Sequence, residues 1–134
     1  MSPFRFMQWI SEGRPVHIFG DGKQRRDFTY VDDIARGTIL GLRPLGCATY
    51  NLGSDQPWSL LDVISLMEAC IGRQAQVEFR PVQAADVPAT WANVERARHE
   101  LGWEPRVALP DGIAHLAAWY RENRTWASEI RTDD

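Results

Sequence analysis

One short run of the sequence, residues 19–33, concentrates the side chains with the clearest chemistry. Gly20 and Gly22 allow the backbone to adopt positive φ and to approach a ligand closely. Arg26 follows them, and its guanidinium can donate two parallel hydrogen bonds to phosphate oxygens. The run therefore predicts a turn that faces a diphosphate, with Arg26 as the cationic ligand. The alternative is that Arg26 only braces the turn by pairing with an acidic side chain of the run, which would be Asp27, Asp32 or Asp33.

Four more motifs follow this run in order along the chain. They are residues 50–53 (YNLG), 59–64 (SLLDVI), 83–93 (QAADVPATWAN) and 101–105 (LGWEP). Together with GDGKQRRDFTYVDD at residues 20–33, their order and spacing resemble the extended short-chain dehydrogenase/reductase family of NAD-dependent nucleotide-sugar epimerases and dehydratases. The most similar subgroup is the UDP-glucuronate 4-epimerases. The resemblance extends over residues 1 to about 122.

The resemblance implies that three polar side chains bind the nucleotide. Arg26 contacts the diphosphate, Gln83 contacts a phosphate, and Asp86 accepts hydrogen bonds from the ribose hydroxyls, as an ionised carboxylate can. Ala85 stands where the family usually has glycine, so the backbone of this loop departs from the family pattern. This departure bears more on the phosphate contact of Gln83 than on the ribose contact of Asp86. The alternative for Asp86 is a turn or helix-capping role.

The resemblance also implies contacts to the base and the sugar. The backbone of His17 and Phe19 touches the base, and Thr90 lies beside the sugar pocket. The side chain of Phe19 can pack in the core while its backbone contacts the base. Trp91 and Trp103 are interpreted as packing residues rather than as stacking platforms.

Two motifs of the intact family are absent from this sequence. Neither the Gly-rich GxGxxG turn that binds NAD nor the Tyr-x-x-x-Lys proton-transfer pair occurs, and Lys23 is the only lysine. We therefore expect residues 1–124 to be the C-terminal substrate-binding portion of such an enzyme and residues 125–134 to be a tail. NAD is implied for the intact enzyme, no cofactor is expected in this chain, and catalysis by this chain alone is not expected.

Three alternatives to this interpretation stay open. The chain could be a non-catalytic module that binds nucleotide sugars, a dimerising remnant that binds no ligand, or a fragment of a GDP-mannose or dTDP-glucose 4,6-dehydratase. For a chain with one cationic ligand, a UDP-sugar would bind weakly, with a millimolar dissociation constant or about −4 kcal/mol.

Composition excludes several other classes of protein. The chain has 134 residues, 44% hydrophobic and 25% charged, and a net charge of −3, which gives no general attraction to nucleic acid. No apolar stretch approaches the roughly 18 residues of a membrane span, and no secretion signal is recognisable at the start, so a cytoplasmic protein is expected. Cys47, Cys70 and the three histidines have no metal-ligand spacing, so neither a metal nor a disulfide is expected.

Hydrophobic periodicity predicts an α/β fold that positions these residues. Helices are expected over residues 2–13, 31–43, 59–72, 93–102 and 110–120, and strands over 15–20, 49–52 and 77–80. The helix after Ser59 has the strongest signals, because Asp62 completes a capping box and Gly72 can end it.

The resemblance divides these elements between two parts of the family fold. One is a small lobe that binds the sugar nucleotide, and the other is a helix and strand, residues 31–52, that would join the nucleotide-binding sheet. These elements would leave apolar surface uncovered in this chain, so a homo-oligomer or a partner chain is expected to cover it.

Overall fold

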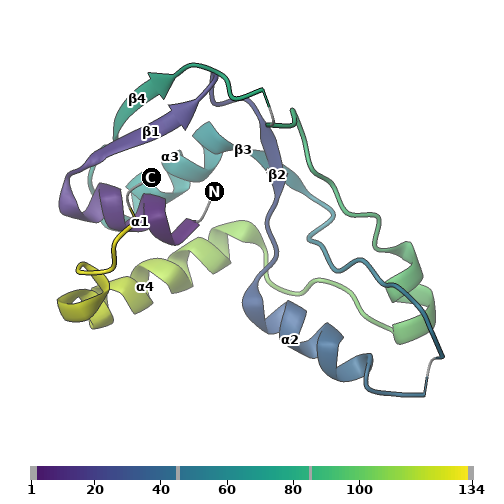
Figure 1. Ribbon diagram of the computed structural model, residues 1–134. Coiled ribbons are helices and arrows are strands. Elements are labelled where there is room, and N and C mark those ends of the chain that lie inside the picture. The colour runs from purple at the N-terminus through teal and green to yellow at the C-terminus, as the bar shows by residue number, and fades with distance from the viewer. Residues whose placement is uncertain (1–2, 45, 85, 133–134) are drawn as a thin grey trace.

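A computed structural model describes residues 3–44, 46–84 and 86–132. Its α/β architecture confirms the predicted fold class (Figure 1). The elements are α1 (Pro3–Glu12), β1 (Pro15–Phe19), β2 (Arg25–Asp27), α2 (Val31–Leu40), β3 (Pro57–Ser59), α3 (Leu60–Ile71), β4 (Gln76–Arg80), the π-helical turn η1 (Ala97–Leu101) and α4 (Leu109–Ala127).

The described residues form two hydrophobic cores. The larger core lies between α1, α3, α4 and the β1–β4 pair, and we call this part the larger lobe. The smaller lobe packs η1 and Trp103 against Leu40, Tyr50 and Leu52. Figure 1 shows the two lobes on opposite sides of the molecule, with β2, β3 and the chain that follows β4 running between them.

Two short sheets place the predicted site residues. β1 and β4 are parallel, with Pro15 opposite Gln76 and Phe19 opposite Arg80, so both strands end at the same edge. β2 and β3 are antiparallel, with Arg26 opposite Trp58. The chain after β4 returns alongside β2, because Arg25 N donates to Pro88 O at 2.8 Å. The loops after β1 and β4 therefore meet beside Arg26.

The helix signals of the sequence are confirmed most fully at α3. Ser59 Oγ accepts a hydrogen bond from Asp62 N at 3.1 Å, and Gly72 adopts a left-handed φ of 76° at the C-terminal end. These two residues satisfy backbone groups that a helix end otherwise leaves exposed. Strand β1 and helices α1 and α2 also lie where the sequence predicts them.

Two strand predictions are wrong in whole or in part. Residues 49–52 form no strand, because no other described backbone pairs with them. β4 forms, but Phe79 is 58% exposed, so the expected half-buried alternation is wrong. The prediction from alternating hydrophobic residues assumed that another layer covers the face of β4 that carries Phe79. In the structure, no such layer of described residues covers this face of the parallel pair.

The end of the chain is more ordered than its sequence pattern predicts. α4 continues past Arg124 to Ala127, whose side chain is fully buried. Gln8 of α1 donates from Nε2 to the carbonyls of Ala127 and Ile130, at 3.0 and 2.8 Å. Trp9 Nε1 donates to Thr132 Oγ1 at 3.1 Å. Residues 126–132 therefore pack on α1, and residues 133–134 lie outside the described residues.

No helix within the described ranges is both long enough and apolar enough to cross a membrane.

Candidate functional site

A cavity of about 250 Å³ lies where β1, β2 and the chain after β4 meet. Five of the six predicted site residues line it: His17, Phe19, Arg26, Gln83 and Asp86. They come from three segments that are far apart in the sequence, and Arg5, Phe6, Ile18, Gln24 and Leu60 complete the lining. The fold thus gathers these predicted residues around one space.

Arg26 and Asp86 form an ion pair at this cavity, between Nη2 and Oδ1. The Arg26 side chain is only 16% exposed, and its Nη1 donates to the carbonyl of Arg25 at 2.7 Å. The pair joins two residues that the resemblance assigned separately to phosphate and ribose. Because the guanidinium has five N–H donors, it retains donors for a ligand beyond these two contacts.

The acidic residues next to Arg26 have other partners. Asp27 accepts hydrogen bonds from Ser54 N at 2.7 Å and from Ala92 N at 3.0 Å. Asp33 pairs with Arg36 at 2.6 Å. Among the described contacts, Arg26 therefore pairs with Asp86 and not with an acidic residue of its own run, which was the alternative expectation.

Gln24 fixes the turn beside the cavity, although the motif that contains it implies no role for its side chain. Its Nε2 donates to Phe19 O at 2.6 Å, so one predicted base-contacting carbonyl already accepts a hydrogen bond. His17 Nε2 lies 3.2 Å from Arg80 Nη2 and 3.4 Å from the carboxylate of Glu78. The side chains of β4 thereby position the ring of His17 at the edge of the cavity.

The two turn glycines adopt the predicted positive φ, 85° at Gly20 and 76° at Gly22. A Cβ on Gly22 would lie 2.8 Å from Cγ of Leu61, and Leu61 N donates to Gly22 O at 3.3 Å. Gly22 is therefore required for packing of the turn against α3.

The segment around Gln83 begins as a turn, with Asp86 N donating to Gln83 O at 3.0 Å. Ala85, the residue that departs from the family pattern, lies outside the described residues.

Thr90 is the predicted site residue that the structure does not bring to this cavity. Its backbone N donates to Arg25 O at 3.0 Å, and its Oγ1 accepts from Asp27 N at 3.4 Å. Thr90 therefore holds the returning chain against β2.

A wider opening of about 880 Å³ adjoins the cavity and shares Phe19, Gln24 and Asp86 with it. Phe79 and Val82 also line this opening and are 58% and 74% exposed. The smaller cavity is lined by Arg26, Gln83 and Asp86, and the wider opening adds apolar side chains together with Asp21, Lys23 and Arg80. An elongated ligand with a charged and a flat portion would find partners for both portions here.

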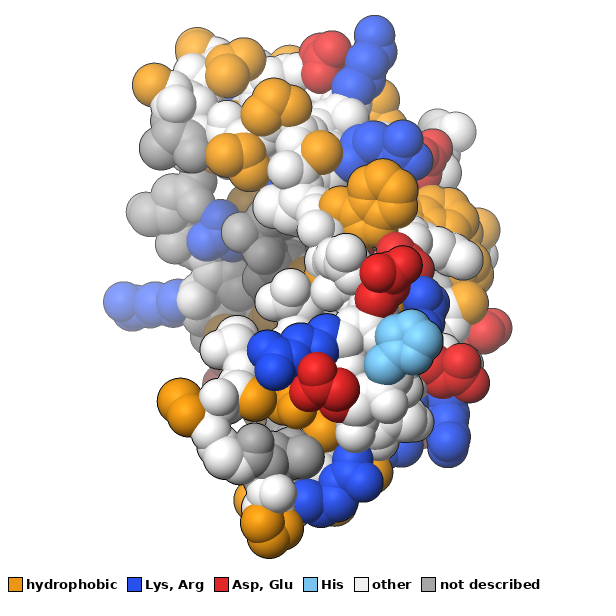
Figure 2. All heavy atoms as spheres, turned by 90° about the vertical axis from the view of Figure 1, so that its right-hand side faces the viewer, with side chains coloured by type: hydrophobic (Ala, Val, Ile, Leu, Met, Phe, Trp, Pro, Cys, Tyr) orange, Lys and Arg blue, Asp and Glu red, His pale blue; other side chains and the backbone are white. Residues whose placement is uncertain are grey.

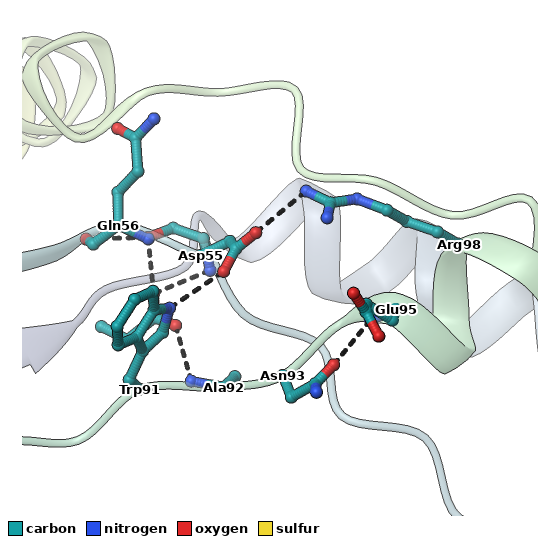
Figure 3. A network of polar contacts seen from close by, with 9 residues as sticks. Asp55, Gln56, Trp91, Ala92, Asn93, Glu95 and Arg98 are labelled. Atoms are coloured by element: carbon teal, nitrogen blue, oxygen red, sulfur yellow. Dashed lines mark hydrogen bonds and ion pairs between the residues drawn. The ribbon is translucent and has the colours of Figure 1, made fainter.

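Trp91 and Arg98 both point toward Asp55 in the smaller lobe (Figure 3). Trp91 Nε1 donates to Asp55 at 2.9 Å and Arg98 Nη2 at 3.1 Å, and Asp55 has a positive φ of 60°. Trp91 is 68% exposed, so its interpretation as a packing residue is wrong, whereas Trp103 is fully buried as expected.

Charges of both signs are interspersed on the face that Figure 2 shows, with hydrophobic side chains toward its upper and lower ends. Within the smaller lobe, Arg96 lies 3.0 Å from Glu100 and Arg98 lies 3.1 Å from Asp55. These pairs balance positive charge locally. Among the described residues, no three His, Cys, Asp or Glu side chains are grouped as metal ligands would be.

Comparison with known families identifies the group to which this chain belongs. Residues 4–116 match the family model for GDP-mannose 4,6 dehydratase. The chain belongs to this family. The predicted resemblance to NAD-dependent nucleotide-sugar epimerases and dehydratases of the extended short-chain dehydrogenase type is confirmed.

Several of the similar proteins are sugar-nucleotide epimerases. The chain is 47% identical over 124 residues to a UDP-glucuronate 4-epimerase of Thermodesulfobacterium geofontis, covering 92% of this chain and 38% of that protein. The crystal structure of UDP-glucuronic acid 4-epimerase from Bacillus cereus, in complex with UDP-glucuronic acid and NAD, matches with a TM-score of 0.84 and 33% identity, over 92% of this chain and 40% of that one. UDP-glucose 4-epimerase of Thermotoga maritima, solved with UDP-glucose, matches with a TM-score of 0.84 and 28% identity, over 89% and 38%.

The chain thus spans about two fifths of the length of the relatives that it matches.

Proposed function

We propose that this chain is the UDP-sugar-binding portion of a nucleotide-sugar 4-epimerase, with UDP-glucuronate as its sugar nucleotide. The observation that carries the proposal is the convergence of Arg26, Asp86, Gln83, His17 and Phe19 on one cavity. The identity of 47% to a UDP-glucuronate 4-epimerase supports the choice of sugar.

Each end of the two adjoining spaces suits a different part of a uridine diphosphate. Arg26, only 16% exposed, offers charge-assisted hydrogen bonds to phosphate oxygens. Its partner Asp86 offers a carboxylate to ribose hydroxyls, which donate hydrogen bonds. The apolar opening beyond Phe19 and Phe79 offers contact to the flat faces of the base.

The one lysine and two of the three tyrosines of this chain do not suit the proton transfer that accompanies hydride transfer to NAD. Lys23, the only lysine, is exposed and lies 3.8 Å from Asp21. Burial and a hydrogen bond to Glu12 raise the pKa of Tyr120 to about 12, and the hydrogen bond to Glu100 raises the pKa of Tyr50. A tyrosine that takes a proton near neutral pH requires a lowered pKa instead. Neither Tyr50 nor Tyr120 is therefore proposed to transfer a proton.

Ligand-observed NMR titrations with UDP, UDP-glucuronate and NAD test this proposal. We expect millimolar binding of the uridine nucleotides and none of NAD. Arg26→Ala should weaken UDP binding about 10-fold or more, because a charge-assisted hydrogen bond contributes roughly 1.5–3 kcal/mol. Arg25→Ala is the matched control, since Arg25 carries the same charge but donates to Pro57 O outside the cavity. Equal losses in both variants, or no UDP binding by the wild-type chain, would contradict the proposal.

A further inference from the structure

We propose that a hollow beside Trp91 in the smaller lobe binds a neutral saccharide, with one pyranose ring lying against the indole. The hollow has a volume of about 380 Å³. Its lining comes from three segments, which are Asp55 before β3, the chain from Trp91 to Glu95, and Arg98 of η1. It shares no lining residue with the 250 Å³ cavity or with the wider opening beside that cavity, so it is a separate site.

Trp91 presents a fixed aromatic surface at this hollow. Its side chain is 68% exposed, whereas most of a tryptophan is usually buried. Its Nε1 donates to Asp55 Oδ1 at 2.9 Å, which satisfies the single polar atom of the indole. The hydrogen bond holds the ring in place while most of the ring stays in water. A ligand that packs on a ring already held in place immobilises little more of the protein.

Asp55 holds the aromatic and the cationic side chain of the hollow together. Figure 3 shows Trp91 and Arg98 reaching Asp55 from two different segments, and Arg98 Nη2 donates to its second carboxylate oxygen, Oδ2, at 3.1 Å. Asp55 has a φ of 60°, a conformation uncommon outside glycine. Arg98 lies in a π-helical turn, a rare geometry that is frequent at functional sites. Two unusual backbone conformations thus meet at this hollow.

The hollow also offers polar groups that suit hydroxyls. Asn93 Oδ1 accepts a hydrogen bond from the backbone N of Glu95 at 3.0 Å. Among the described residues, the carboxylate of Glu95 and the amide nitrogen of Asn93 have no hydrogen-bond or ion-pair partner. A carboxylate accepts hydrogen bonds and an amide nitrogen donates them, and a sugar hydroxyl can do both. Neighbouring hydroxyls of one sugar can therefore bind to the two side chains.

The charges of the lining disfavour a phosphorylated ligand. Asp55 and Arg98 pair with each other, so the carboxylate of Glu95 leaves the described lining with an excess negative charge. This charge repels a phosphate. A neutral pyranose instead carries C–H groups on its faces, which can pack on an aromatic ring, and hydroxyls around its rim. An aromatic surface with a few polar groups beside it is the lining that such a ligand requires.

Saturation-transfer NMR with methyl β-D-glucopyranoside and the full chain tests the proposal. We expect millimolar binding, with the strongest saturation at the ring C–H protons. Trp91→Ala should weaken binding about 5-fold or more, and Trp91→Phe, which keeps a flat ring, should retain part of it and serves if Trp91→Ala does not fold. Trp126→Ala is the matched control, because Trp126 is 51% exposed and its Nε1 donates to Asn123 in the larger lobe, outside the hollow.

Glucose 6-phosphate tests the role of charge. We expect the wild-type chain to bind it more weakly than the glucoside. Glu95→Gln removes the excess negative charge but keeps an acceptor oxygen, so the difference between the two ligands should shrink. Tighter binding of glucose 6-phosphate than of the glucoside by the wild-type chain would overturn the assignment of a neutral ligand.

UDP separates this hollow from the proposed nucleotide site. Saturating UDP and Arg26→Ala should both leave glucoside binding unchanged, and Trp91→Ala should leave UDP binding unchanged. Displacement of the glucoside by UDP would overturn this proposal while supporting the proposed function. Glucoside binding that depends on Trp91, without any binding of UDP, would support this proposal and contradict the proposed function. No binding of the glucoside, or equal losses in Trp91→Ala and Trp126→Ala, would overturn this proposal alone.

Discussion

Asp33 shows how one residue of the RDFTYVDD run serves the fold. Its side chain is buried, and Oδ2 accepts hydrogen bonds from the backbone N–H groups of Arg106 and Val107 at 2.9 and 3.0 Å. Trp103 Nε1 also donates to the backbone carbonyl of Asp33 at 2.8 Å. The start of α2 is thereby attached to the chain that leads into α4.

Ionisation of Asp33 should make the stability of the protein depend on pH. Burial alone would raise the pKa of its carboxyl, but the hydrogen bonds from Val107, Arg106 and Arg36 outweigh burial and lower it. A carboxyl with a lowered pKa stabilises the folded state above its unfolded pKa, about 4, and this contribution is lost as pH falls through the folded value.

We therefore expect Asp33→Asn to lower the free energy of unfolding at pH 7, and the difference from wild type to shrink as pH falls below about 4. Urea denaturation between pH 7 and pH 3 measures it. Asp32→Asn is the control, because Asp32 is exposed in the same turn of α2 and should show little dependence. A difference that stays constant down to pH 3 would contradict this role.

The sequence predicts a ligand-binding role for a residue of the site where that residue occupies a defined position in a motif. Arg26 and Asp86 stand out by type and spacing, and the structure places both in the cavity. Gln24 and Arg5 also line it, but the motif that contains Gln24 implies no role for its side chain, and Arg5 lies in no motif. Arg5 reaches the cavity only because α1 packs beside β1, and that contact depends on the tertiary fold.

At the scale of elements, Asp27 connects three segments of the chain. It ends β2, and its carboxylate accepts hydrogen bonds from the backbone of Ser54 and of Ala92. Gly53 permits this approach, since a Cβ there would lie 2.7 Å from Asp27 Oδ2 and 2.3 Å from Cβ of Ala92.

Asp27→Ala should therefore loosen the junction between the two lobes. It leaves two backbone N–H groups without their acceptor, and we expect the free energy of unfolding to fall by about 1–3 kcal/mol. Chemical denaturation measures this loss. Asp32→Ala makes the same chemical change on the exposed face of α2 and should cost about 0.3–1 kcal/mol through the helix dipole. Equal losses in the two variants would show that Asp27 does not act as a connector.

Helices and strands were predicted correctly where several local sequence signals agree, and less well where an element depends on a distant partner. α3 has a cap, a helical period and a terminal glycine, and all three hold in the structure. Residues 49–52 have strand-forming side chains, but a strand also requires a neighbouring strand, and the described residues provide none. α4 continues past its apolar period because Gln8 binds the carbonyls at its end, a contact between residues 119 positions apart.

At the scale of the whole molecule, the smaller lobe presents apolar side chains to solvent. Val31 and Ile39 of α2 are each 67% exposed, and Leu42 just after α2 is 80% exposed. Apolar residues gathered on one helix are typical of a contact surface. We propose that a second copy covers this face when the chain is alone in solution.

Sedimentation velocity over a range of concentrations tests this proposal. We expect the weight-average sedimentation coefficient to rise with concentration, because burying Val31, Ile39 and Leu42 removes apolar surface from water at roughly 25 cal/mol per Å². Replacing Val31 and Ile39 by Ser should abolish the rise. Trp126→Ser, a change at a 51% exposed residue of α4 in the larger lobe, should leave it intact. A wild-type chain that stays monomeric throughout, or that associates only through Trp126, would contradict the proposal, because the α2 face would then be stable in water without a partner.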